Sequence, residues 1–94
     1  MTSFMVVATF KAGTNMSEVM AVVPQEQARI DELQDQWRIG ALYLATAARQ
    51  TVFLEAFADS ADDAIATVET LPMARWWDLD VYPLNARAAA PAAS

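Results

Sequence analysis

The stretch LPMARWWDLDVYPL, residues 71–84, decides how the rest of the sequence is interpreted. We expect Pro72 to end a helix, because proline lacks the amide hydrogen that a helix interior needs, and a strand to begin at the tryptophan pair. Side chains of a strand alternate between its two faces. One face carries the apolar residues Trp77, Leu79 and Val81. The other carries rings and carboxylates, Trp76, Asp78, Asp80 and Tyr82. Such a mixture suits a pocket or a subunit contact.

Three more strands are predicted upstream of this stretch. Residues 3–11 and 51–58 are rich in Val, Phe and Thr and are largely apolar on both faces, which is typical of central strands. Residues 40–47 predict another strand, and the short connection that follows them indicates a hairpin with residues 51–58.

Two helices are predicted between the strands. The first has its N-cap at Asn15 or Ser17 and runs towards Trp37, with Pro24 either kinking the helix or beginning it. The second is capped by Ser60 and ends at the proline of the closing stretch.

The order strand, helix, strand, strand, helix, strand is that of a ferredoxin-like domain. The fold class is therefore α+β, with a four-stranded antiparallel sheet. Residues 1–84 form one domain, and residues 85–94 form a low-complexity tail. Two helices can cover only one face of such a sheet, so the second face is expected to pack on another subunit in a dimeric α+β barrel.

Composition limits the size and the partners of this protein. The chain has 94 residues, and 55% of them are hydrophobic, more than a monomer of this size is expected to bury, which favours a homo-oligomer. The formal net charge of −6 argues against binding to nucleic acid or to anionic membranes. The amino-terminal residues show neither a basic leader nor an apolar run of membrane-spanning length, so we expect a cytoplasmic protein.

Cysteine and histidine are both absent from the sequence. Their absence excludes disulfides, a thiolate nucleophile, Ser-His and Cys-His pairs, and a haem or zinc site that uses histidine. Chemistry therefore has to come from carboxylates, arginine, lysine, tyrosine or bound water, and we expect no metal site.

Glu26 interrupts an apolar stripe of the first helix. At about 100° per residue, the stripe consists of Val19, Val23, Ile30, Leu33 and Trp37. A carboxylate in the middle of this stripe would lose hydration, which would raise its pKa towards values useful for proton transfer. The alternative is that Glu26 only favours the positive end of a helix that begins at Pro24.

The closing strand resembles that of the muconolactone isomerase family. The resemblance is carried by LPMARWWDLDVYPL, by residues 27–37 with their ELQ, and by the spacing from Ala47 through Ser60 to Pro72. It implies a dimeric α+β barrel, often assembled into larger rings of dimers. It also implies a cofactor-free enzyme of aromatic-compound breakdown that moves a double bond within a small unsaturated lactone.

By position, the resemblance makes Glu26 and Asp78 the candidate catalytic residues. Asp78 has an alternative role in a subunit contact, since alternating acidic residues on an outer face commonly pair with arginine. Arg49 stands where the family leads us to expect a histidine.

Four further residues are candidates for substrate binding. Tyr43 can orient a carbonyl oxygen or lie at an interface, and Arg49 can clamp a carboxylate or be an exposed turn residue. Glu55, in a central strand, needs a partner or a cavity. Trp76 can form a pocket wall or simply pack.

Two other functions remain open alongside the isomerase. Relatives with the same barrel include cyclases and monooxygenases that tailor polyketides, and the apolar segment IGALYLA would suit a larger ring. The chain can also be a ligand-binding or assembly module without catalysis, which the missing histidine favours.

Overall fold

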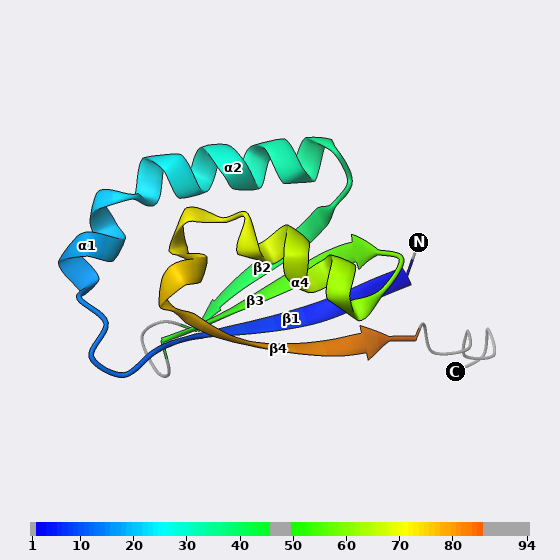
Figure 1. Ribbon diagram of the computed structural model, residues 1–94. Coiled ribbons are helices and arrows are strands. Elements are labelled where there is room, and N and C mark those ends of the chain that lie inside the picture. The colour runs from blue at the N-terminus through cyan, green and yellow to red at the C-terminus, as the bar shows by residue number, and fades with distance from the viewer. Residues whose placement is uncertain (1, 46–49, 86–94) are drawn as a thin grey trace, which may run out of the picture.

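The strands and helices follow the predicted order, with two additions, in the computed structural model, which describes residues 2–45 and 50–85 (Figure 1). The strands are β1 (Thr2–Phe10), β2 (Ile39–Ala45), β3 (Thr51–Ala58) and β4 (Trp77–Leu84). The α-helices are α1 (Met16–Ala21), α2 (Val23–Asp35) and α4 (Ala61–Glu69). A 3-10 helix, η1 (Pro72–Trp76), precedes the last strand.

The four strands form one antiparallel sheet in the order β2-β3-β1-β4. β1 pairs with both β3 and β4, so that Val6 lies between Leu54 and Val81. The two strands predicted as central are therefore central. This topology confirms the α+β class with a four-stranded antiparallel sheet, and it is compatible with a ferredoxin-like fold.

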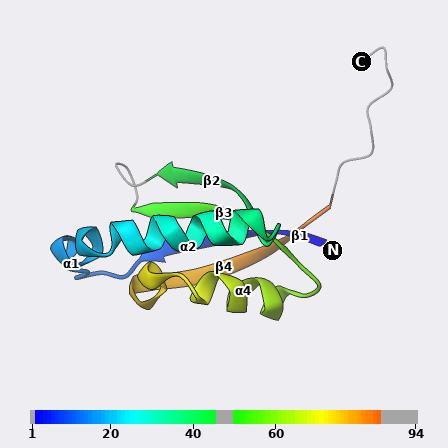
Figure 2. The same ribbon diagram turned by 90° about the horizontal axis from the view of Figure 1, so that it is seen from above.

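The core lies between the sheet and the helices, which all cover the same face (Figures 1 and 2). Alternate side chains of the central strands are buried in it: Phe4, Val6, Ala8, Phe10, Val52, Leu54, Ala56 and Ala58. The helices add Val19, Leu33, Ala64 and Val68. The ring of Trp77 meets the ring of Phe10 edge-on, with centroids 5.9 Å apart. The alternation predicted for the closing strand is confirmed from Trp77 onwards, because the acidic residues of β4 are exposed while Trp77, Leu79 and Val81 pack in or against the core.

The first predicted helix is two helices. Asn15 caps α1 with its side-chain oxygen, which accepts from the amides of Ser17 and Glu18. Pro24 lies in the first turn of α2, where its missing amide hydrogen costs no hydrogen bond. The prediction that Trp37 belongs to the buried stripe is wrong, since its side chain is 72% exposed. The helix ends at Asp35, and the left-handed backbone of Trp37 (φ 57°) takes it out of the helical periodicity.

The segment before β4 also differs from the prediction. Ser60 caps α4 as expected, accepting from the Asp63 amide, but α4 ends at Glu69 and Pro72 begins η1. Trp76 therefore belongs to η1 and not to the outer face of the strand. The guanidinium of Arg75 lies over its ring, 4.3 Å from the centroid.

The face of the sheet opposite the helices has no cover within residues 2–45 and 50–85. Its centre consists of partly exposed apolar side chains, Met5, Val7, Phe53 and Phe57. The flanking strands add Tyr43, Asp78, Asp80 and Tyr82, which are exposed or partly exposed. We call this surface the open face. Among the described residues, none of the helices has the length and hydrophobicity that a membrane-spanning segment requires.

Candidate functional site

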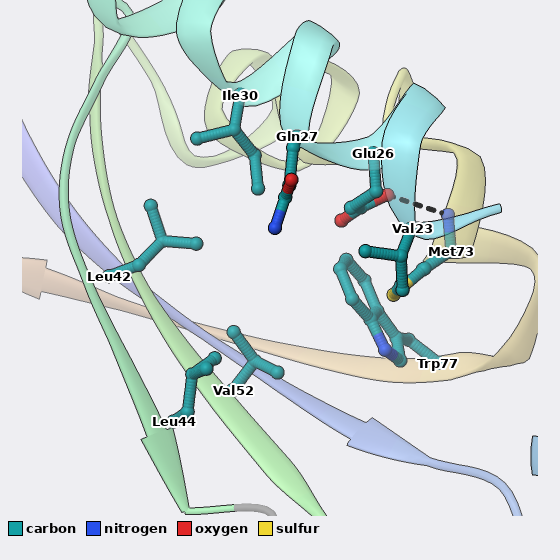
Figure 3. Close-up of a pocket in the computed structure, with 9 residues that line it drawn as sticks. All are labelled: Val23, Glu26, Gln27, Ile30, Leu42, Leu44, Val52, Met73 and Trp77. Atoms are coloured by element: carbon teal, nitrogen blue, oxygen red, sulfur yellow. Dashed lines mark hydrogen bonds between the residues drawn. The ribbon is translucent and has the colours of Figure 1, made fainter. Parts of the chain in front are cut away.

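A cavity of about 310 Å³ lies between α2, the β2–β3 hairpin strands and η1 (Figure 3). Its lining is mostly apolar and consists of Val23, Glu26, Gln27, Ile30, Leu42, Leu44, Val52, Met73 and Trp77. We call it the Glu26 cavity. Its size and its few polar groups are typical of small-molecule sites.

Glu26 is placed by the helix break and by η1. It lies in the first turn of α2, on the side that faces the sheet, and its side chain is only 5% exposed. One carboxyl oxygen accepts a hydrogen bond from the Met73 amide, with 2.9 Å between the two atoms. That amide is free to donate because Met73 is at the start of η1, where backbone N–H groups have no partner within the helix. The other oxygen is turned towards the cavity (Figure 3).

Burial raises the pKa of Glu26 above its ordinary value, and the hydrogen bond from the Met73 amide partly opposes this shift. No basic side chain in the described part of the chain forms an ion pair with Glu26. Glu26 therefore holds a proton more tightly than a solvated glutamate does, as a group that takes a proton from carbon has to do. The prediction that burial perturbs Glu26 is confirmed.

Gln27 and Trp77 complete the polar features of the cavity. Gln27 is exposed, and its amide extends over the cavity with no hydrogen-bond partner among residues 2–45 and 50–85 (Figure 3). The indole nitrogen of Trp77 is buried and likewise has no acceptor within those residues. Neither residue was predicted from the sequence as part of the site, because no local sequence signal shows which residues near Glu26 line a cavity.

A second cavity of about 240 Å³ adjoins the first. The two share Leu44, Val52 and Met73, and the second continues towards α1 along Phe10, Met16, Val19 and Met20. No charged or hydrogen-bonding side chain is among these residues. The hollow beside Glu26 is thus extended by a wholly apolar compartment.

Asp78 does not share a site with Glu26 in this chain. It lies on the open face beside Thr9, whereas Glu26 lies on the helix face of the sheet. Tyr43 is also on the open face, opposite Phe53, and is 60% exposed. Of the candidate residues that the structure describes, Glu26 alone lines the cavity.

Glu55 has a structural partner on the open face. The pairing of β2 with β3 is irregular between Ile39 and Leu42, and this bulge frees the amide of Ala41. Glu55 accepts a hydrogen bond from that amide at 3.2 Å, which meets its expected need for a partner. Trp76 packs against the core beneath Arg75.

Arg49 lies outside the described residues, as do residues 86–94 of the predicted tail. No model of a known protein family matches the sequence, and no curated protein matches it significantly. The likeness of residues 71–84 to muconolactone isomerases therefore remains a resemblance. What the cavity can do follows from its own geometry and chemistry.

Proposed function

We propose that this protein is a cofactor-free isomerase that shifts a double bond within a small unsaturated lactone, in the manner of muconolactone isomerases. The observation that carries the proposal is the buried carboxyl of Glu26 at the wall of an apolar cavity, with one oxygen held by the Met73 amide and the other turned towards the ligand space (Figure 3). Geometry of this kind suits a group that exchanges a proton with carbon.

In the proposed reaction, Glu26 acts first as a base and then as an acid. Its ionised oxygen takes a proton from the ring carbon next to the double bond, and the electron pair left behind spreads over the lactone as a dienolate. The same carboxyl returns the proton to the carbon two atoms along, so the double bond moves and Glu26 ends ionised, as it began. The Met73 amide keeps the carboxyl in place throughout.

The test is solvent deuterium incorporation into an unsaturated lactone. Glu26→Gln keeps the shape of the side chain and an acceptor for the Met73 amide but cannot take the proton. We expect the exchange rate to fall by about 100-fold or more. Glu32→Gln, at an exposed glutamate of the same helix, is the matched control and should keep the rate. Normal exchange by a folded Glu26→Gln protein would remove Glu26 from the mechanism.

A second candidate function is favoured by the adjoining apolar cavity. Together the two compartments, about 310 and 240 Å³, offer more room than a single small lactone needs. This supports cyclisation or oxygenation of a polyketide-like ring, or binding of such a ring without chemistry. Saturable binding of a polycyclic aromatic compound with no deuterium exchange into any lactone would favour this candidate.

The proposal includes a homodimer built through the open face. Its support is the row of apolar side chains that this face leaves without cover in residues 2–45 and 50–85. Asp78 and Tyr43 then belong to the subunit contact and not to the proton transfer. A cytoplasmic location, rings of dimers and a role in aromatic-compound breakdown are parts of the same proposal. A gene cluster for aromatic-ring cleavage around this gene would support that role, and a polyketide cluster would favour the second candidate.

A further inference from the structure

No basic side chain of the described residues is part of the lining of the Glu26 cavity. The described basic residues are Lys11, Arg29, Arg38 and Arg75. Arg29 donates to the hydroxyl of Thr70, the C-cap of α4, at 3.2 Å. Arg38 donates to the hydroxyl of Thr67 in α4 at 2.7 Å. Arg75 covers the Trp76 ring, and Lys11 is exposed beyond the end of β1. None of the four lines either cavity.

The ionisable group that does line the Glu26 cavity is itself an acid. A ligand carboxylate that entered would lose hydration and approach Glu26 without a positive charge from the described lining to compensate it. An uncharged carbonyl or hydroxyl meets no such penalty. It can accept from the Gln27 amide, which extends over the cavity and has no partner within residues 2–45 and 50–85 (Figure 3).

The second cavity adds a preference for size and polarity. It meets the first at Leu44, Val52 and Met73 and offers only apolar surface beyond them. A substituent on a ring held beside Glu26 would enter this compartment, where the burial of apolar groups is energetically favourable.

We propose that the Glu26 cavity selects an uncharged, carbonyl-bearing ring with an apolar substituent and discriminates against ring compounds that carry a carboxylate. The reaction of this substrate class depends on the proton transfer by Glu26 proposed above. The selectivity for it depends on where the charged side chains lie. It therefore separates this protein from an isomerase whose lactone carries a free carboxylate.

The test compares a carboxymethyl-substituted butenolide with its methyl ester, two probes that share the ring and differ in charge. For the full chain, deuterium exchange into the ester is expected to have a kcat/KM at least about tenfold higher than exchange into the acid, after correction for uncatalysed exchange. Equal or faster exchange into the acid overturns the proposal.

Gln27→Arg places a positive charge at the mouth of the cavity and is expected to shift the ratio towards the acid by about tenfold or more. Gln27→Met, of similar length but without charge, is the matched control: it should lower kcat/KM for both probes, which share the lactone carbonyl and lose the same donor, but should keep the ratio in favour of the ester. If Gln27→Arg leaves the ratio unchanged, the charge of this cavity does not set selectivity, and the proposal fails.

Arg49→Met tests the predicted binding residue among the two arginines, Arg49 and Arg87, that lie outside the described residues. A native protein that prefers the acid, and loses that preference in Arg49→Met, would show that Arg49 supplies the charge and would overturn the proposal. If neither probe exchanges, the proposed isomerase fails. Equilibrium dialysis with the ring-saturated analogues of the acid and the ester then measures binding selectivity without any reaction. Tighter binding of the ester supports the inference, and equal, reversed or undetectable binding refutes it.

Discussion

At the scale of single residues, Glu26 is a carboxyl group in a position that the helix pattern assigns to an apolar side chain. It is buried against the sheet and has one backbone hydrogen bond, from Met73. The hydrogen bond keeps the carboxyl ordered, while burial disfavours its charge. Such a group stabilises the fold less when it is ionised than when it is protonated.

This coupling has a definite sign. Because the folded protein holds the Glu26 proton at a higher pKa than the unfolded chain, whose value is near 4.5, the favourable contribution is complete below 4.5 and is lost as pH rises through the raised pKa. Glu26→Gln stays uncharged and can still accept from the Met73 amide. Its free energy of unfolding should exceed that of the native protein near neutral pH, and the difference should shrink as the pH falls through the raised pKa and be smallest below 4.5. Urea unfolding across pH measures this, and a difference that grows on acidification would contradict the sign.

At the scale of elements, the bulge of β2 is the feature that shapes the open face. Glu55 reaches across it to the Ala41 amide, and this requires that the neighbouring residue have no side chain. A Cβ at Gly40 would meet the carboxyl oxygen of Glu55 and would lie 2.9 Å from the Phe57 ring. A glycine is therefore needed at position 40 because the Glu55 carboxyl and the Phe57 ring approach the backbone closely, and not because of its backbone conformation.

Gly40→Ala should accordingly destabilise the protein, by about 1–3 kcal/mol, because two packed side chains must move. The measurement is the free energy of unfolding in urea. The double variant Gly40→Ala with Glu55→Ala should lose less unfolding free energy than the sum of the losses of the two single variants. Full additivity would mean that Gly40 and Glu55 do not meet in the way described.

At the scale of the whole molecule, one face of the sheet is covered by helices and the other has no cover within residues 2–45 and 50–85 (Figure 1). Phe53 lies near the centre of the open face, opposite Val7 in β1 and Tyr43 in β2. A charge there would have to be desolvated in any face-to-face dimer.

Sedimentation equilibrium is expected to give a mass of at least twice the 10.3 kDa of one chain for the native protein. Phe53→Glu should shift the population to monomer while circular dichroism shows an intact fold. Trp37→Glu introduces the same charge at a side chain that is 72% exposed, away from the open face, and should leave the mass unchanged. A native protein that sediments as a monomer refutes the dimer.

The sequence by itself determined the order of the elements, the two central strands and the burial of Glu26. These follow from local signals: the caps Asn15 and Ser60, the apolar alternation of the strands and the helical spacing around Glu26. Local signals did not reveal η1 or the exposure of Trp37, because a single turn and a left-handed residue leave almost no periodic pattern.

Only the tertiary structure decided what surrounds Glu26. The Met73 amide is 47 positions away in the sequence, and it reaches the carboxyl because η1 turns back against α2. The same packing leaves Asp78 on the opposite face of the sheet and keeps the described basic side chains out of the lining of both cavities. A residue's type and spacing predict which face it takes, but the neighbours of that face come from distant segments, and their placement depends on how the helices pack on the sheet.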